Sequence, residues 1–567
     1  MSDADGFRES ALDAMIDAAL SIMGTCPASL LIGIPVSKDF LSQQARRPQI
    51  RGIFLRTQTS GAYIDTASNE TANFAPSAII IQRTPLLGVR QLLVLARSGV
   101  RRIVQLEHRR VPKCRSIAGR LIAELAASVL SRLSRLLRRS PASILFERMQ
   151  LRAMRRLRLD QIPIQTARFG TGPVIHATGG LGSGGSERQL TLTVSGLHST
   201  MDRQVRVVCQ HRLEGALAFF SEPLRRAGIP IEDDVLADFS PVVTNTQLIE
   251  TLNRSFPRES EFADTICAFA RMIARDNPSV VHCWLDPINV AAGIAAALCG
   301  VPRIVLGCRS VAPIHFDLYE RNMWAGYRAL LQLPHVTMLN NSNAGAASYS
   351  AWLGIARDRI QVIPNAVDAS FDATADPTAQ AGFRTRFDLG HGPVIGMLGR
   401  MSEEKRPLFW LDIARLVLQS RPDVKFLWAG DGPMRQAMIA RAKQYAMSER
   451  LILPGTMNDA AIPLSTMTAL LLSSRMEGLP NVLLEAQSLG VPVVTASVGG
   501  APETIDEGVT GRAVAGSSPQ DFADALLSFV NDPAALARAK SAGPQFIKKR
   551  FSVERAIEQT RSIYRLP

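Results

Sequence analysis

Short apolar runs alternate with stretches of helical periodicity over two long parts of the chain, residues 173–337 and residues 393 onward. The first part contains PVIHAT, VRVVCQ, VVHCW and RIVLG, and the second contains VIGML, KFLWAG, LILPG, ALLLSS and VPVVTA. Runs this short and this apolar are typical of strands buried on both faces of a parallel sheet. The pattern predicts two doubly wound α/β halves, joined near VTMLNNSNAG and QVIPNAVD.

The first 165 residues follow a different pattern. ASLLIGIPV and AIIIQ predict strands or buried helical segments of a small α/β module over residues 1–110, whose role the sequence does not indicate. A basic helical linker is expected over residues 111–165. Its clearest part is residues 116–140, where six apolar side chains fall within an arc of roughly 160°: Leu121, Leu125, Val129, Leu133, Leu136 and Leu137. Arginines occupy the opposite side.

Most of the net charge of the chain comes from one segment that includes most of this linker. Residues 101–160 contain sixteen Lys and Arg against four acids, so they carry +12 of the formal +14. A basic amphipathic helix favours adsorption to an anionic inner-membrane surface through residues 116–159. Nucleic-acid binding is the weaker interpretation, because no aromatic residues are interleaved with the arginines. An ordinary helix packed on the next domain, with a solvated basic face, remains the alternative.

Length and composition narrow the class of protein further. A chain of 567 residues, 46% of them hydrophobic, has room for about three domains with large cores. No apolar run reaches bilayer-spanning length, and the acidic opening MSDADGFRES argues against a signal peptide. The seven cysteines form no CxxC pair, which favours a reduced cytoplasmic compartment and no zinc site.

The stretch SRMEGLPNVLLEAQSLGVPVV, residues 474–494, places two glutamates beside a predicted strand end. Residues 469–472 predict a strand, Pro480 suits the first turn of the following helix, and Gly490 ends that helix. Parallel sheets bind ligands outside the carboxyl ends of their strands, and a helix N-terminus attracts phosphate. Glu477 and Glu485 therefore suit a nucleotide site, with Glu485 on a ribose diol. The alternative is that Glu477 only caps a helix and Glu485 is a solvated surface residue.

A glycine-rich loop follows the first strand of the first half, in GGLGSGGSERQL, residues 179–190. Gly180, Gly182 and Gly185 satisfy the G-x-G-x-x-G pattern of dinucleotide-binding proteins, which is weak by itself. That pattern also requires an acid after the second strand, where this chain has Gln210, His211 and Arg212. An NAD site would thus lack its ribose carboxylate, whereas an NADP site is not excluded.

In the second half, Arg400 and Lys405 follow the first predicted strand in VIGMLGRMSEEKRP. Two cations at a strand end suit a diphosphate and could stabilise it as a leaving group. The alternative is a solvated charged turn that includes Glu403 and Glu404.

Taken together, these motifs resemble a known family. GGLGSGGSER, VIPNAVD, GRMSEEK, AGDGP, EGLPNVLLEA and GVPVVTASVGGAPETI are similar, in order and wording, to retaining GT-B glycosyltransferases of family 4, of the bacterial surface-polysaccharide type. The resemblance covers about residues 172–565. It implies an acceptor-side Rossmann-like domain over 166–370, a nucleotide-sugar-binding domain over 371–550, and a final helix over 551–567 that crosses back to the first of these domains.

The resemblance also implies roles for individual residues. Arg400 and Lys405 would hold the donor diphosphate, Glu477 would contact the donor sugar or phosphate region, and Glu485 would bind the ribose hydroxyls. Backbone groups would close on the donor at Gly182, Gly184, Gly185, Gly478, Leu479 and Pro480. Family enzymes generally need no metal or other cofactor, because basic side chains and a helix dipole take the place of the ion.

One departure from the family concerns the acceptor side. Many relatives carry a histidine just after the strand that corresponds to RIVLG, where this chain has Cys308, Arg309 and Ser310. Arg309 is therefore a candidate for contact with the acceptor or the donor sugar. His282, in VVHCW, is a second candidate.

The expected function is transfer of a sugar, with retention, from a nucleotide-diphosphate sugar to a saccharide or lipid-linked acceptor in polysaccharide biosynthesis. A UDP-sugar is the expected donor, and no nucleic-acid partner is expected. The expected location is cytoplasmic, peripheral to the inner face of the membrane. An NAD(P)-dependent oxidoreductase and a non-catalytic scaffold of a polysaccharide assembly complex are the alternatives.

Overall fold

The computed structural model describes the backbone of six strands between residues 28 and 116, and then residues 151–152, 154–155, 157–168, 171–236, 260–316, 319–368, 371, 376–457 and 459–565. The chain divides into two compact units, residues 1–143 and 144–567. The amphipathic helix predicted over 116–140 lies outside the described residues, as does the start of the basic segment 144–159. The domain boundaries drawn from the sequence stay predictions.

The first unit contains one mixed sheet. Its strands are β1 (Ala28–Ile32), β2 (Ile50–Arg56), β3 (Tyr63–Asp65), β4 (Ser77–Ile81), β5 (Arg102–Leu106) and β6 (Lys113–Ser116), in the order β3-β2-β1-β4-β5-β6. The four inner strands are parallel, and β3 and β6 pair antiparallel at the two edges. Of the two possibilities for ASLLIGIPV and AIIIQ, strands or buried helical segments, the structure shows strands, β1 and β4.

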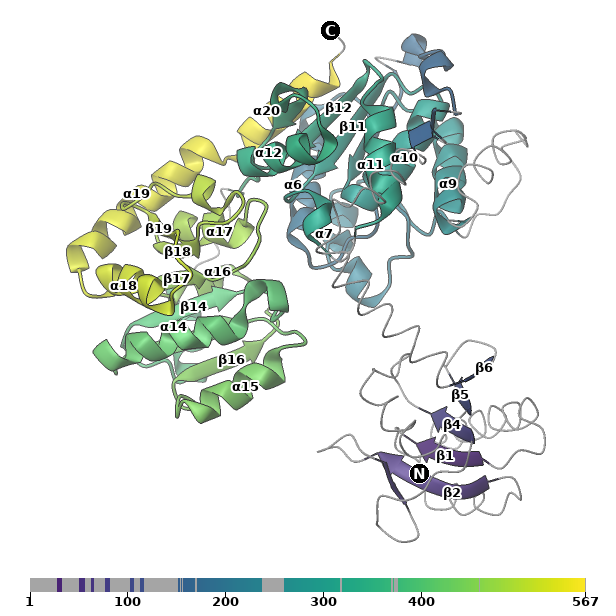
Figure 1. Cartoon of the computed structure of the whole chain (residues 1–567). Helices are drawn as coiled ribbons and strands as arrows, with labels where there is room; N and C mark the ends of the chain where they lie inside the picture. The colour runs from purple at the N-terminus through teal and green to yellow at the C-terminus, as the bar shows by residue number, and fades with distance from the viewer. Residues whose placement is uncertain are drawn as a thin grey trace. The chain divides into compact units, whose positions relative to one another are not determined.

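The second unit begins with a domain built on a seven-stranded parallel sheet, which we call the first α/β domain (Figure 1). Its strands are β7 (Val174–Thr178), β8 (Val205–Cys209), β9 (Ile231–Glu232), β10 (Val280–Trp284), β11 (Arg303–Cys308), β12 (Val336–Asn340) and β13 (Ile360–Val362). The helices that connect them are α6 (Gly185–Thr200), α7 (Ser221–Arg226), α9 (Ser260–Asp276), α10 (Asp286–Leu298), α11 (Arg321–Leu330) and α12 (Asn343–Leu353).

A six-stranded parallel sheet forms the second α/β domain. Its strands are β14 (Val394–Leu398), β15 (Lys425–Ala429), β16 (Leu451–Gly455), β17 (Ala469–Leu472), β18 (Val493–Ala496) and β19 (Gly511–Val514). Its helices are α13 (Pro377–Arg386), α14 (Pro407–Ser420), α15 (Arg435–Gln444), α16 (Ala461–Ser465), α17 (Asn481–Ser488), α18 (Pro519–Val530) and α19 (Pro533–Arg550). The expected pair of doubly wound halves is confirmed.

The strand orders locate the functional edge of each sheet. In the first α/β domain the order is β13-β12-β11-β10-β7-β8-β9, so the chain reverses direction across the sheet between β7 and β10. In the second the order is β16-β15-β14-β17-β18-β19, and the reversal lies between β14 and β17. Loops leave opposite faces at such a switch point and create a crevice outside the carboxyl ends of the strands.

The strands at these switch points are buried on both faces, which explains their apolar sequences. All five residues of β7 and β10 are buried, as are all four of β17. Trp410 of α14 stacks edge-on against Trp428 of β15 in the second core, with ring centroids 5.4 Å apart. Because these strands are buried on both faces, their register in the sheet is strongly specified. The register in turn determines where the loop after each strand begins.

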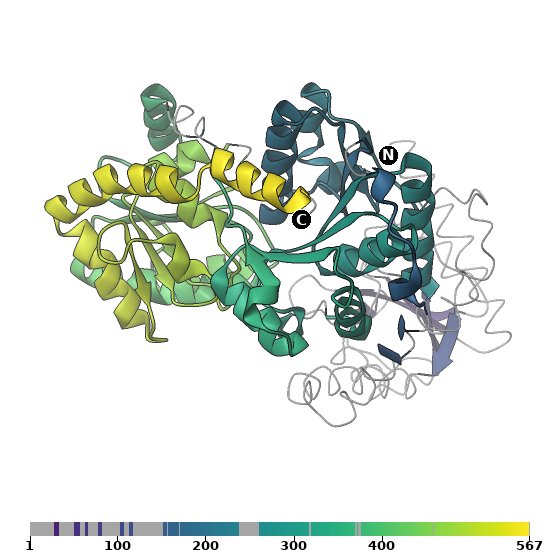
Figure 2. The same ribbon diagram turned by 90° about the horizontal axis from the view of Figure 1, so that it is seen from above.

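The last helix, α20 (Val553–Tyr564), returns from the second α/β domain to the first. Ser552 pairs with Val367 in an isolated bridge, and α20 then packs on α6 (Figure 2). Ile557 sits in the hydrophobic core shared with β7 and α6. The chain thus connects the two domains a second time. Within the described residues, no helix combines the length and apolar character needed to cross a bilayer.

Candidate active site

Lys405 and Glu477 meet at the switch point of the second α/β domain. Lys405 ends a short 3-10 turn, Glu403–Lys405, after β14, and Glu477 lies in the loop after β17. The Lys405 Nζ lies 2.6 Å from the Glu477 Oε1, with the side chains 23% and 9% exposed. The two residues come from separate motifs but form one partly buried ion pair at the carboxyl ends of β14 and β17.

Main-chain contacts hold these two loops together. The Arg475 N–H donates to the Glu404 carbonyl at 2.8 Å, and the Ser473 hydroxyl donates to the Lys405 carbonyl at 3.2 Å. Arg406, next to Lys405, adopts φ 54° as the N-cap of α14. A non-glycine residue in this left-handed region is uncommon, and such strain often accompanies functional sites.

The structure treats the two predicted cations differently. Arg400 is exposed, and no ion pair of its side chain is present among the described residues. Lys405 is paired. The alternative for this segment was a solvated charged turn. The Lys405 side chain is not solvated in that way, because it is paired with Glu477. The exposed Arg400 side chain still fits that alternative.

Gly478 brings the loop after β17 against the first α/β domain. A Cβ at this position would lie 2.3 Å from the Arg309 carbonyl oxygen, so no other residue fits without a shift of backbone. Gly499, at φ 53°, is required for a similar reason, because a Cβ at this position would lie 1.8 Å from the Glu477 carbonyl oxygen. The two glycines let three stretches of backbone meet beside Glu477.

Two asparagines hold the loop after β17 through hydrogen bonds. The Asn365 Nδ2 donates to the Leu479 carbonyl at 2.6 Å and to the Asn481 Oδ1 at 2.7 Å. The Asn481 Nδ2 in turn donates to the Gly185 carbonyl at 2.9 Å. Pro480 is the N-cap of α17, one position before the first turn in which the sequence placed it. The helix starts of α6 and α17 are thus joined across the two domains.

The glycine-rich loop of the first α/β domain lies next to the loop after β17. Gly184 is the N-cap of α6, and Gly185 is its first residue. The Leu181 N–H donates to the Leu217 carbonyl at 2.9 Å, and Gly182 faces the Ala216 carbonyl. This segment fixes the loop so that its glycines lie beside the start of α17.

Glu485 is buried one turn into α17 and pairs with Arg188 of α6. The Arg188 Nη1 donates to the Glu485 Oε1, and the Glu485 side chain is 5% exposed. The structure thereby excludes the alternative that Glu485 is a solvated surface residue. A carboxylate buried to this extent requires a partner, and here the partner comes from the other domain.

Arg309 lies directly after β11 with its guanidinium over the ring of Trp284, 4.5 Å from Cζ to the centroid. Its Nε is buried and has no hydrogen-bond partner among the described residues. Burial lowers the pKa of Arg309 to about 10, so the side chain remains charged at neutral pH. The Arg309 backbone lies against Gly478, so Arg309 lies beside the loop that carries Glu477.

His282 lies elsewhere, inside the core beneath α20. It is 3% exposed, its Nδ1 lies 2.7 Å from the Tyr564 hydroxyl, and its ring stacks on Trp284. Burial, helped by the nearby His176 and Arg309, holds the pKa of His282 well below its usual value. A neutral, enclosed imidazole of this kind supports packing between the last helix and the sheet, so we leave His282 out of the site.

Sequence reasoning missed Arg188, Asn365 and Asn481. Each stands inside a quoted motif, GGSER, VIPNAVD or GLPN, without an assigned role. Their partners are up to 297 positions away along the chain, as for Arg188 and Glu485. No local pattern carries that information.

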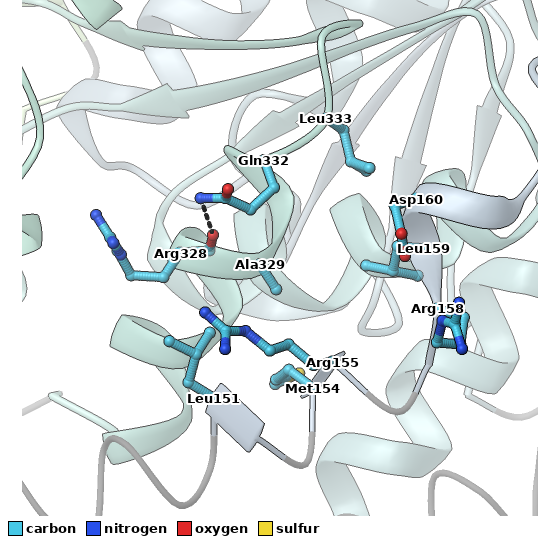
Figure 3. A pocket seen from close by; sticks show the side chains of 10 residues that line it. All are labelled: Leu151, Met154, Arg155, Arg158, Leu159, Asp160, Arg328, Ala329, Gln332 and Leu333. Atoms are coloured by element: carbon cyan, nitrogen blue, oxygen red, sulfur yellow. Dashed lines mark hydrogen bonds between the residues drawn. The ribbon is translucent and has the colours of Figure 1, made fainter.

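One further pocket, of about 530 Å³, lies on the first α/β domain (Figure 3). Its lining combines Arg155, Arg158 and Asp160 with Arg328, near the end of α11, and Leu333, just after it. Since α11 ends just before β12 begins, this pocket lies at the amino ends of the strands, away from the crevice. No cluster of three or more potential metal ligands occurs in the described parts of the chain.

Comparison with known proteins identifies both domains. Residues 183–371 match the family model described as Glycosyltransferase Family 4, and residues 392–532 match the one described as Glycosyl transferases group 1. Anabaena Alr3699/HepE, solved in complex with UDP, has a similar structure, with a TM-score of 0.56 and 19% identity. The match covers 69% of this chain and 98% of that one.

Two curated relatives extend the comparison. The Vi polysaccharide biosynthesis protein VipC/TviE of Salmonella typhi is 28% identical over 59% of this chain and 61% of its own length. The chain thus spans less than two thirds of that relative. The UDP-Gal:alpha-D-GlcNAc-diphosphoundecaprenol alpha-1,3-galactosyltransferase of Escherichia coli is 23% identical over 59% of this chain and 84% of its own length.

Proposed function

Because this chain is a glycosyltransferase with the GT-B fold, we propose that it transfers a sugar from a nucleotide-diphosphate sugar to a saccharide or lipid-linked acceptor in polysaccharide biosynthesis. The observation that carries the proposal is the Lys405–Glu477 pair, 2.6 Å apart at the switch point, with Glu485 one turn into the adjoining helix. A cation, a helix N-terminus and a buried acid in this order suit the phosphates and ribose of one nucleotide.

The donor is proposed to lie along α17. Its diphosphate would take the place beside Lys405, with Arg400 drawn in from solvent as a second cation. The backbone of Gly478, Leu479 and Pro480 would border the sugar phosphate, and Glu477 would contact the sugar. Glu485 would accept both hydrogen bonds of the ribose diol. Gly182, Gly184 and Gly185 would close the site from the first α/β domain.

The proposed chemistry proceeds with retention and without a protein nucleophile. The bond between the anomeric carbon and the diphosphate oxygen breaks, and the acceptor oxygen bonds to that carbon on the same face. The acceptor proton passes to the departing phosphate oxygen. Lys405 and the start of α17 would stabilise the charge that develops on the diphosphate, which makes them the main catalytic contribution. The proposal includes no metal ion or cofactor, since these groups would carry that charge.

The acceptor is proposed to approach beside Arg309. A lipid-linked acceptor is supported by the printed name of the Escherichia coli relative, whose acceptor carries a diphosphoundecaprenol. The charge of residues 116–159 supports a peripheral position on an anionic inner-membrane surface. UDP is the proposed nucleotide of the donor, as in the name of the same relative.

A ligand panel tests the proposal. The purified full chain is incubated with UDP-sugars, GDP-sugars and NADPH, with and without EDTA, and thermal stabilisation and donor hydrolysis are measured. Stabilisation by a nucleotide-sugar that resists EDTA, with a product of retained anomeric configuration by NMR, is the expected result. Stabilisation by NADPH alone would replace the proposal with an oxidoreductase, and no ligand response in an intact protein would favour a scaffold.

A further inference from the structure

The pair between Arg188 and Glu485 uses the carboxylate that the proposed donor needs. The Arg188 Nη1 donates to the Glu485 Oε1 from the first turn of α6, whereas Glu485 belongs to α17 of the other domain. No other hydrogen bond to the Glu485 carboxylate occurs within the described residues. In the free protein, the buried acid therefore has its charge compensated from across the crevice.

A ribose and Arg188 would compete for this acid. The Glu485 side chain is only 5% exposed, and the Arg188 guanidinium donates to its carboxylate. A ribose diol that is to reach both carboxylate oxygens therefore has to take the space that the guanidinium fills. The exclusion depends only on the positions of Arg188 and Glu485 and on the donor chemistry of a ribose.

Between the two partners, Arg188 is the one that can move. Its side chain is 30% exposed, against 5% for Glu485, and the guanidinium lies near the Phe220 ring at 5.9 Å. Its helix start is held independently, because the Asn481 Nδ2 donates to the Gly185 carbonyl. A rotation of the Arg188 side chain alone would then open the acid, without separation of the two helices.

We propose that Arg188 gates the ribose subsite: it occupies Glu485 while the donor is absent and is displaced by the ribose diol when the donor binds. The inference rests on the proposed function, since it assumes a nucleotide at Glu485. The gate has two consequences. It keeps the buried carboxylate paired in the empty enzyme, and it lowers the apparent affinity for the nucleotide by the fraction of molecules whose gate is open.

Isothermal titration of the full-length protein with UDP and with 2′,3′-dideoxy-UDP tests the gate. Arg188→Gln removes the competing charge and keeps a side chain of similar reach, so UDP should bind about three- to tenfold more tightly than to wild type. The dideoxy compound lacks the diol and has no need of Glu485, and its affinity should be the same for both proteins. GDP and its dideoxy analogue serve as the pair if UDP is not the nucleotide that binds.

Two further variants make the result specific. Arg206→Gln removes another partly buried arginine, one that pairs with Asp276 at 2.6 Å inside the first α/β domain, and should leave nucleotide affinity unchanged. Glu485→Gln should weaken UDP and spare the dideoxy compound. Circular dichroism and thermal unfolding of each variant establish that it is folded.

The outcomes separate the gate from the function on which it rests. If Arg188→Gln leaves UDP affinity unchanged or weakens it, while Glu485→Gln weakens UDP, the gate is wrong and the donor site stands. Equal tightening of UDP and the dideoxy compound would also overturn the gate, because the effect would then be general electrostatics. If neither nucleotide binds to folded wild type or to Arg188→Gln, both the gate and the proposed function are overturned.

Discussion

The hydroxyl of Tyr564, in the last helix, lies 2.7 Å from the Nδ1 of His282, on a central strand of the first α/β domain. The same hydroxyl lies 3.3 Å from the His176 Nε2. The contact joins residues 282 positions apart and connects the last helix, α20, to the sheet of the first α/β domain. It explains why a histidine near the carboxyl end of a strand is structural here.

Tyr564→Phe should lower the free energy of unfolding by about 1 kcal/mol, because it leaves a buried imidazole without this hydrogen bond. Urea denaturation followed by circular dichroism measures the change. Ser562→Ala, at an exposed position of the same helix, serves as the control and should be neutral. Equal stability of Tyr564→Phe and wild type would show that the contact contributes nothing.

Acid should destabilise the protein through the buried histidines. Burial lowers the pKa of His176 from 6.5 to about 3. Between these two pH values, the imidazole is protonated in the unfolded chain and neutral in the folded protein. The stability that depends on neutral His176 is complete above pH 6.5. It falls as the pH drops toward 3, by up to about 1.4 kcal/mol per pH unit.

His176→Asn should therefore flatten the decline of unfolding free energy between pH 6.5 and pH 4, since asparagine has an acceptor for the Trp284 N–H but does not titrate. His198→Asn, at an exposed position on α6, should leave the profile as in wild type. Parallel profiles for wild type and His176→Asn would remove His176 as the cause.

Lys405→Ala should reduce kcat for sugar transfer by a factor of about 10² to 10³, equivalent to about 2.7–4 kcal/mol of barrier, because the leaving diphosphate loses a preorganised cation. Arg400→Ala should act in the same direction. Lys425→Ala, which removes a lysine paired with Asp388 at the start of β15, should leave kcat intact. Turnover by Lys405→Ala close to wild type would refute the assignment.

Gly478→Ala should cost at least tenfold in kcat/KM while the protein stays folded. The added Cβ would meet the Arg309 carbonyl at 2.3 Å and push the loop that carries Glu477 away from the first α/β domain. Steady-state kinetics and circular dichroism measure the two effects. Gly382→Ala, in α13 with no atom within 4 Å of the new Cβ, is the matched control and should keep full activity.

Glu503 caps a helix of the opposite domain. Its carboxylate accepts hydrogen bonds from the backbone N–H groups of Asn343 and Ala344, both at 2.8 Å, at the start of α12. Glu503→Gln should lower the free energy of unfolding by about 1 kcal/mol, because the helix end loses a charged acceptor. Among the described residues, the Glu507 carboxylate accepts a hydrogen bond within its own domain, from the Ala513 N–H. Glu507→Gln therefore separates the cross-domain effect in urea denaturation.

Much of the architecture followed from the order of apolar runs. Strands buried on both faces leave continuous apolar sequences, and β7, β10, β14 and β17 were all recognisable for that reason. Glycines and Pro480 marked the loop and helix boundaries to within two residues, because their backbone preferences act locally. Lys405, Glu477 and Glu485 were identifiable as site candidates by the same logic, since each follows a predicted strand.

The partners of these residues were decided only by the tertiary structure. That Lys405 reaches Glu477, that Arg188 occupies Glu485, and that His282 is enclosed by Tyr564 all depend on contacts between segments 72, 297 and 282 positions apart. Backbone preferences and the periodicity of buried positions depend on residues close together in the chain, so they can be predicted from the sequence. Which distant side chain satisfies a buried charge is settled when the two domains and the returning helix close on one another.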